Sequence, residues 1–328
     1  RVLVLERGQL PLGASTRNAG FACFATIGEI LDDLSQWDED TVIETIALRW
    51  QGLQKLRALV NEEQVDYQNR GGYEIVDDQL QFDQYQSHLK HINALIEEAT
   101  GLKHCIKVER QDFSKAFFGQ YFFNEYEAQL NPGLLVRQLY DTARNIGVEF
   151  CFNFCVKQYE SGDKYIVHSE NGLTLAARHI IFCTNAFTNR ILKGMDITPC
   201  RNQVFISKPM KEFPWKACYH YDRGYTYFRA VNNCLLIGGG RNMDMANETT
   251  DEFGSNESIE HFLRDIIERL GLSHPFELDC KWSGIIATGA SKRPIIERQA
   301  DGSYVAVRLG GMGVAIAAGV ADKLVAML

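Results

Sequence analysis

Short apolar runs alternate along the chain with longer stretches of helical periodicity. The run 2–5 predicts a buried strand that ends in Glu6 and a turn. From 40 to 63, apolar residues recur every three or four positions, which predicts an amphipathic helix that Asp38 or Asp40 can cap. The same periodicity and helix-start and helix-stop residues predict further helices at 27–34, 79–99, 131–145, 258–270 and after Gly313.

Between these helices, runs of β-branched and aromatic residues predict strands. They lie at 65–76, 148–156, 165–168, 173–175, 179–185, 203–207, 226–230, 235–238 and 304–309. Interleaved strands and helices indicate a mixed α/β protein. Because no repeat and no Pro/Gly-rich linker marks a boundary, we expect two domains that share several chain crossings.

Charge and cysteine content narrow the function classes. The 328 residues carry a formal net charge of -8, which gives no general attraction to nucleic acid. Nine cysteines without a CxxC motif indicate buried free thiols in a reducing, cytoplasmic compartment, and Cys151 and Cys155 lack the partners of a zinc site, so no metal is predicted. The apolar run 310–328 is interrupted by Asp322 and Lys323, so a buried helix is favoured over a membrane span. Nothing in the sequence predicts an oligomeric state.

Three features could carry chemistry. An acid at the end of an apolar strand, such as Glu6, is typical of the second strand of a dinucleotide-binding unit, where it binds a ribose hydroxyl. The chain starts without Met inside this strand, so we expect the preceding glycine loop to lie upstream. The glycine turn 310–313 opens a helix whose N–H groups favour anions or carbonyls, although it could simply be a tight turn. The small and polar loop 13–20 could surround a pyrophosphate and a heteroaromatic ring.

Taken together, these motifs resemble the flavin-dependent D-amino-acid oxidase superfamily, which includes glycine, sarcosine and gamma-glutamylputrescine oxidases. The resemblance continues in order through the segments 131–135, 182–186, 199–203, 227–229, 237–240, 282–284, 293–296 and 310–313. The form Ala-Ser-x-Arg-Asn-x-Gly in the loop 14–20 looks most like the gamma-glutamylputrescine oxidase branch.

The resemblance implies a Rossmann-like FAD-binding domain (1–64, 127–199 and 281–328) and an interleaved α+β substrate domain on a largely antiparallel sheet (65–126 and 200–280). It implies oxidation of an amine or amino acid to an imine that water hydrolyses, with dioxygen or another acceptor reoxidising the flavin. The residues implied to bind FAD are Glu6, Arg7, Ser15, Thr16, Arg17, Asn18, Val156, Thr184, Asn185, Gly310, Gly311, Gly313 and Val314. A helix N-terminus at Gly311 would stabilise the negative charge that develops on a reduced flavin.

The substrate side is less defined. Tyr227, Arg229 and His220 lie on predicted substrate-domain strands and are candidate catalytic residues, although each could instead be a core aromatic or a surface ion-pair partner. Amino-acid oxidases of this superfamily hold the substrate carboxylate with an Arg shortly after the Trp-x-Gly segment, and that position here is Ile286. Since Ile cannot form a bidentate clamp, an amine whose carboxylate is remote is favoured.

Two other classes stay open at this stage. The chain could be a member of the superfamily that has lost catalysis and serves as a binding or structural subunit. It could also be a nicotinamide-dependent dehydrogenase, which shares the ribose-binding acid but does not account for the carboxy-terminal glycine turn.

Overall fold

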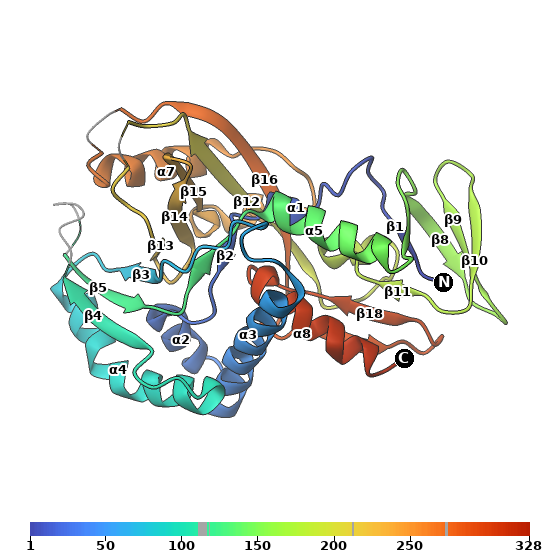
Figure 1. Ribbon diagram of the computed structural model, residues 1–328, viewed down its shortest axis with the longest axis horizontal. Helices are drawn as coiled ribbons and strands as arrows, with labels where there is room; N and C mark the ends of the chain where they lie inside the picture. The colour runs from blue at the N-terminus through green and yellow to red at the C-terminus, as the bar shows by residue number, and fades with distance from the viewer. Residues whose placement is uncertain (111–116, 118, 212, 273–274) are drawn as a thin grey trace.

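A computed structural model describes residues 1–110, 117, 119–211, 213–272 and 275–328, and its largest element is an eight-stranded sheet (Figure 1). The strand order is β16-β12-β15-β14-β13-β3-β5-β4, and every pair is antiparallel except β13 with β3. The strands are β3 Gly72–Ile75, β4 Ile106–Arg110, β5 Gln120–Asn124, β12 Thr198–Ser207, β13 Cys218–Tyr221, β14 Thr226–Val231, β15 Cys234–Gly239 and β16 Leu278–Thr288.

Side-chain alternation gives this sheet two different faces. Successive strand residues point to opposite sides, so Phe228 and Tyr227 belong to separate clusters. Phe228 packs with Trp215, Tyr219 and the buried face of helix α7 (Glu257–Arg269). Tyr227 and His220 lie on the other face, which the rest of the molecule covers.

Four helices pack around the second core. They are α2 Ile27–Leu34, α3 Glu39–Leu59, α4 Gln79–Thr100 and α8 Gly313–Val325. Asp38 accepts a hydrogen bond from the Thr41 N–H and caps α3, and Gly101 ends α4 with a φ of 78°. In Figure 1, α3 lies between α4 and α8, which places α8 against the body of the molecule.

The remaining elements are short. Strands β1 Leu3–Leu5 and β7 Glu149–Cys151 pair in parallel, and β2 Phe21–Ala22 pairs with β6 Ala128–Gln129. One three-stranded sheet consists of β8 Val156–Glu160, β9 Tyr165–Ser169 and β10 Thr174–Ala177. A second consists of β11 Ile181–Phe182, β17 Ile295–Arg298 and β18 Tyr304–Val307. The other helices are α1 Ala14–Arg17, α5 Pro132–Asn145, α6 Met245–Glu248 and the 3₁₀ helices η1 Asn185–Arg190 and η2 Arg241–Met243.

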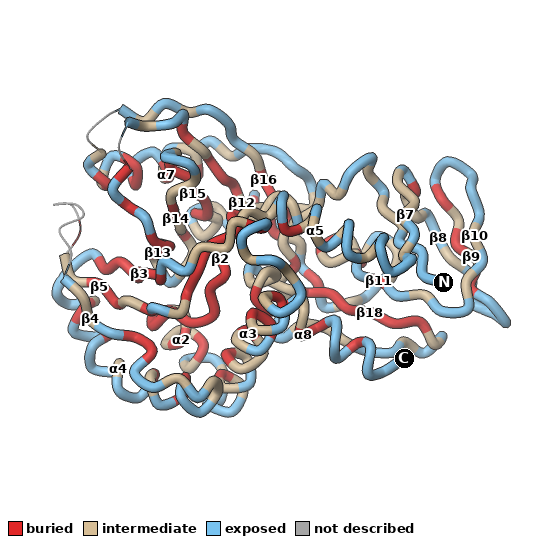
Figure 2. Tube along the Cα trace, viewed as in Figure 1, coloured by how far each residue is buried: buried red, intermediate tan, exposed pale blue. Residues whose placement is uncertain are grey.

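The mixed α/β class and the largely antiparallel sheet are confirmed, but several strand predictions are wrong in detail. The first strand is not buried: Val2, Leu3 and Val4 are exposed, and β1 belongs to a sheet of only two described strands, β1 and β7 (Figure 2). The predicted strand 148–156 is broken at Asn153, whose φ of 57° ends the extended conformation. Of the predicted strand 65–76, β3 is a regular strand and Gln68 forms an isolated bridge with Gln129; of 179–185, the regular strand is β11.

The predicted domain division stays a prediction. The large sheet takes its strands from 72–124 and 198–288, close to the predicted substrate-domain segments 65–126 and 200–280, both of which contain a few residues outside the described set. Strands β12 and β16 run across the predicted boundaries, so any hinge between the domains lies within continuous strands.

The cysteine prediction holds in part. Cys23, Cys105, Cys200 and Cys218 are buried free thiols, whereas Cys183 and Cys280 are exposed. Among the described residues, every helix is too short or too polar to cross a membrane. The cytoplasmic location stays a prediction.

Close packing of α3 on α8 generates the first testable prediction. A Cβ added at Gly52 would lie 2.1 Å from the Ala315 carbonyl oxygen on α8. We expect Gly52→Ala to destabilise the protein by about 1–3 kcal/mol in urea unfolding, because backbone has to move. Gly319→Ala is the control: its Cβ would lie 3.4 Å from the flexible Leu48 side chain, so its effect should stay within about 1 kcal/mol. Equal effects of the two changes would contradict the prediction.

Candidate functional site

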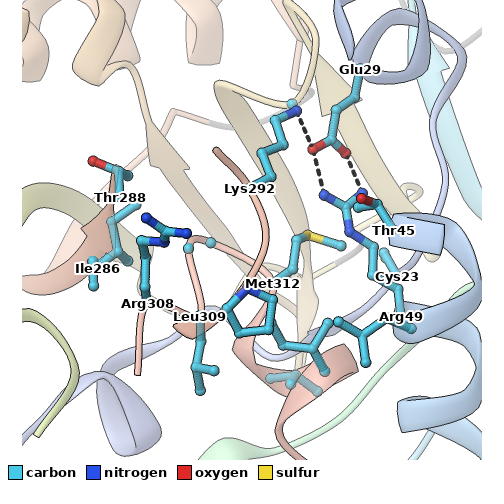
Figure 3. Close-up of a pocket in the computed structure, with 18 of the residues that line it drawn as sticks. Cys23, Glu29, Thr45, Arg49, Ile286, Thr288, Lys292, Arg308, Leu309 and Met312 are labelled. Atoms are coloured by element: carbon cyan, nitrogen blue, oxygen red, sulfur yellow. Dashed lines mark hydrogen bonds and ion pairs between the residues drawn. The ribbon is translucent and has the colours of Figure 1, made fainter. Parts of the chain in front are cut away.

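A cavity of about 1070 Å³ lies between the large sheet, helices α2 and α3, the α1 loop and the turn that precedes α8. Its volume is at the upper end of the range of small-molecule sites. Figure 3 shows side chains from α2, α3, β16 and the α8 turn pointing into one space. The cavity is therefore a candidate active site built from segments that are distant in the sequence.

The turn before α8 forms one wall. After β18 the chain enters left-handed conformations at Arg308 (φ 63°) and Gly310 (φ 57°), and the Asn185 Oδ1 accepts the N–H groups of Arg308 and Leu309 at 3.0 and 3.2 Å. The Gly310 N–H donates to the Ala287 carbonyl of β16 at 3.0 Å. These bonds fix the direction in which α8 leaves the sheet.

Helix α8 presents an uncapped N-terminus to the cavity. It begins at Gly313, and the preceding Met312 makes no side-chain capping bond. Gly311, Met312 and Val314 line the cavity, and a Cβ at Gly311 would meet nothing within 4 Å. Since the first N–H groups of a helix have no acceptor within the helix, this wall attracts anions and electron-rich carbonyls.

An ionic network forms the wall on the side of α2 and α3 (Figure 3). Arg49 donates to both oxygens of Glu29 at 2.9 Å, and Lys292 Nζ lies 2.8 Å from Glu29 and 2.5 Å from Asp33. Burial opposes the charge of Glu29, but Arg49 and Lys292 outweigh it and lower the pKa of this carboxyl. The network ties α2 and α3 to the loop 289–294.

Arg308 anchors the same loop from the other side. Its guanidinium pairs with Asp196 and donates to the Arg293 carbonyl at 2.9 Å and to the Ser291 hydroxyl at 3.1 Å. The Arg308 side chain is buried, whereas its partner Asp196 is about half exposed. Arg308 therefore holds both the backbone of the α8 turn and the loop that faces it.

A buried triad lies where β13 meets the cavity. His220 Nε2 lies 2.9 Å from Glu127 Oε2, and the Glu127 Oε1 accepts the N–H groups of Phe24 and Ala25 at 3.3 and 3.4 Å. Burial lowers the pKa of His220, but the charge and hydrogen bond of Glu127 outweigh it and raise that pKa to about 9. Burial and the neighbouring Cys218 raise the pKa of the Cys23 thiol.

This triad could also hold a metal ion. One ligand atom from each of Cys23, Glu127 and His220 lies within 4.8 Å of the others, and a thiolate, a carboxylate and an imidazole suit zinc. In the structure, however, His220 and Glu127 satisfy each other directly. Sequence reasoning missed this group because its members lie roughly a hundred residues apart, with none of the spacings that mark metal motifs.

Tyr227 and Ile286 complete the sheet side of the cavity. Tyr227 packs edge-on against Phe21, and its burial raises its pKa to about 12 although the charge of Arg241 opposes this. Ile286, the position at which the resemblance would place a carboxylate-binding Arg, lines the cavity with an uncharged side chain. Burial alternation along β16 gives Ile286 the same orientation as Trp282 and Gly284.

Among the predicted cofactor-binding residues, Arg17, Asn18, Gly310, Gly311 and Val314 line the cavity. Arg17 donates to the carbonyls of Leu12 and Ser283 at 2.8 and 3.0 Å, and its own carbonyl accepts the Trp282 indole N–H. These contacts fix α1 against β16. The Asn18 side chain accepts the Gly20 N–H at 2.9 Å, a hydrogen bond inside the loop 13–20 that helps to fix its conformation.

The other predicted residues lie off the cavity wall. Glu6 accepts the Gly8 N–H at 2.8 Å, and the Arg7 guanidinium stacks 3.9 Å from the Phe187 ring. Thr184 bonds to Thr188, Thr16 donates to the Pro11 carbonyl, and Ser15 is exposed. Three further residues also lie away from the cavity wall: Val156 at the start of β8, Gly313 at the first position of α8 and Asn185 behind the α8 turn.

Arg229 also lies behind the wall. It donates to the carbonyls of Ala19 and Leu130, at 2.5 and 3.0 Å, and burial lowers its pKa. A Cβ at Gly20 would lie 2.2 Å from the Leu130 carbonyl oxygen and 2.5 Å from the Arg229 guanidinium. Arg229 therefore fixes the loop that carries Asn18 to the cavity, and its contacts are with backbone.

Comparison with known proteins identifies the class. The family model of FAD dependent oxidoreductases matches residues 1–327, so the chain belongs to that family, and its cofactor is FAD, as predicted. No curated protein matches the chain.

Solved structures share the fold at low identity. Glycine oxidase from Geobacillus kaustophilus is 16% identical with a TM-score of 0.74, over 100% of this chain and 87% of that chain. L-proline dehydrogenase from P. horikoshii is 15% identical with a TM-score of 0.74, over 98% and 85%. The FAD-bound, dithionite-reduced L-alpha-glycerophosphate oxidase from Mycoplasma pneumoniae is 13% identical with a TM-score of 0.78, over 100% and 88%.

The buried His220–Glu127 pair predicts a pH-dependent stability. The pKa of His220, about 9, lies above its ordinary value of 6.5, so the pair stabilises fully below pH 6.5 and its contribution is lost as pH rises through about 9. Below pH 6.5 we expect Glu127→Gln to be less stable than the wild type by about 3 kcal/mol, and the difference to shrink towards pH 9. Unfolding by urea across this pH range measures it.

Glu125→Gln is the control, because Glu125 forms an exposed ion pair with Lys107. It should change stability by less than about 1 kcal/mol, with no such pH dependence. A pH-independent difference for Glu127→Gln would show that His220 is uncharged in the folded protein.

Proposed function

We propose that this protein oxidises the C–N bond of an amine, giving an imine that water hydrolyses. The observation that carries the proposal is the uncapped N-terminus of α8 on the wall of a large cavity, in a chain that belongs to the FAD-dependent oxidoreductase family. When bound, FAD accepts the hydride and passes the electrons to dioxygen or another acceptor.

The residues of the cavity fit one end of this cofactor. The open space at Gly311 allows a flat ring to approach the backbone, and the N-terminal N–H groups of α8 favour the negative charge that a reduced flavin develops at its carbonyl edge. Arg17 and Asn18 lie on the α1 side of the same space. For the adenosine end, Glu6, Arg7 and Val156 stay predictions, as do Ser15, Thr16, Thr184 and Gly313.

Asn185 acts in this proposal as a positioning residue. Its amide oxygen holds the two N–H groups that precede Gly310, so it fixes where the glycine turn meets the cofactor. Arg229 is a second positioning residue, because it holds the Ala19 carbonyl next to Asn18 and Gly20. Neither side chain needs to touch FAD for its loss to weaken binding.

The substrate lies against His220, Tyr227 and Ile286. Since the pKa of His220 is about 9, its imidazole is a cation paired with Glu127 near neutral pH, and we assign it to shaping the polar end of the site instead of accepting the amine proton. Ile286 provides no charge for an α-carboxylate, which favours an amine over an α-amino acid.

A flavin-binding test follows from the space at Gly311. We expect Gly311→Val to reduce flavin content at least tenfold, because its methyl groups would occupy the space that the ring needs, while the unfolding midpoint stays near that of the wild type. Visible absorbance and urea unfolding measure the two quantities. Gly162→Val, in an exposed turn, is the control and should retain flavin.

Substrate oxidation is tested by anaerobic mixing. We expect amines to bleach the visible flavin band faster than the matched α-amino acids, and peroxide to form once air is admitted. A flavin that every amine and amino acid leaves oxidised would instead support a catalytically inactive binding subunit. A colourless protein that added FAD cannot restore would contradict the proposal itself.

A further inference from the structure

Most cationic side chains on the cavity wall already have a carboxylate partner. These pairs are Arg49 with Glu29, Lys292 with Glu29 and Asp33, Arg223 with Asp32 and Asp222, Arg293 with Glu44, and Arg308 with Asp196. Arg17 lacks a carboxylate but donates to two backbone carbonyls. Their charges are thus neutralised or their donors used before any ligand enters.

Arg241 is different. Within the described part of the chain its one side-chain hydrogen bond runs from Nη1 to the Met245 sulfur at 3.5 Å, a weak acceptor, and no carboxylate lies within ion-pair distance. The side chain is half-buried, and it lines the same cavity as Ile286 and Tyr227. His220 pairs with Glu127, and Lys323, another cation on the wall, is exposed in the last turn of α8.

The surroundings hold Arg241 in place. Gly240, in a left-handed conformation (φ 73°), lies between the end of β15 and Arg241 and donates its N–H to the Tyr225 carbonyl at 2.8 Å. The Arg241 guanidinium carbon lies 5.0 Å from the centre of the Tyr225 ring. Such stacking orients the plane of a guanidinium and leaves its edge free to donate.

The charge of Arg241 also reaches into the cavity. It opposes the rise in the pKa of Tyr227, whose hydroxyl has no hydrogen-bond partner among the described residues. A free guanidinium edge and a free phenol on one wall are the donors that a carboxylate requires. At Ile286, by contrast, the wall offers no charged group to bind a carboxylate.

We propose that Arg241 is an anion subsite that binds a carboxylate at the end of the substrate remote from the oxidised C–N bond. The substrate class is then an amine that carries its carboxylate several bonds away. The inference rests on the proposed function for the position of the reacting end, but the subsite itself is tested by binding alone.

Isothermal calorimetry of the flavin-loaded protein provides the first test. The probes are ω-amino carboxylates of increasing chain length and the matched ω-amino primary amides, which lack the negative charge. We expect the wild type to bind the best carboxylate about 10- to 100-fold more tightly than its amide, the effect of a charge-assisted hydrogen-bond pair. Arg241→Gln should remove this preference, and Arg241→Lys should restore part of it.

Flavin reduction provides the second test. In Arg241→Gln, the half-saturating concentration of the ω-amino carboxylate should rise by the same factor, while the limiting rate of flavin reduction stays near that of the wild type. A merely structural role would lower the limiting rate or the flavin content as well. Arg137→Gln, on the exposed face of α5, removes the same charge from the protein and should change neither quantity.

The two proposals can fail separately. If Arg241→Gln keeps the full preference for the carboxylate, the subsite is wrong, whatever the enzyme oxidises. If the preference depends on Arg241 but none of the amines reduces the flavin, the subsite stands and the proposed oxidation is wrong. A wild type that binds the carboxylate and the amide equally well would also overturn the subsite.

Discussion

The geometry of the site depends on one side chain, Asn185. Its amide oxygen accepts two successive backbone N–H groups, at Arg308 and Leu309, across more than a hundred residues of sequence. Arg308 has a φ of 63°, which costs a non-glycine residue of order 1 kcal/mol that its surroundings must offset. The double hydrogen bond supplies that constraint, and the Arg308 side chain adds to it by binding Asp196.

The local turn at 308–310 therefore determines the direction of the whole helix α8. Because α8 continues directly from the turn, the direction of its N-terminal N–H groups is set by Asn185 and by the Ala287 carbonyl of β16. The position of α8 is also fixed by its packing on α3 at Gly52, where only a hydrogen fits beside the Ala315 carbonyl. The helix is thus fixed at its start and along its side, which keeps the wall at Gly311 open to a ligand.

Local signals in the sequence predicted the elements well where the cause is local. Asp38, one of the two candidate caps, caps α3, the helix expected at 131–145 forms as α5, and the helix expected at 79–99 forms as α4, because these elements depend on neighbouring residues. Strand alternation could also have predicted that His220 and Tyr227 share a face. The sequence could not predict the exposure of Val2 and Leu3, because that depends on which distant segments pack on the faces of this strand.

The site residues that sequence reasoning missed share a physical character. They are charged residues that form ion pairs with residues far away in the sequence: Glu29, Arg49, Lys292 and Glu127. No spacing along the chain predicts such pairs. Neutralisation has a further consequence for recognition. A cavity whose charges are mostly paired has little net attraction for any ion, so selectivity falls to the few donors left without a partner. Residue type alone cannot distinguish Arg241 from Arg293; the difference is that Arg293 pairs with Glu44, whereas no carboxylate of the described residues pairs with Arg241.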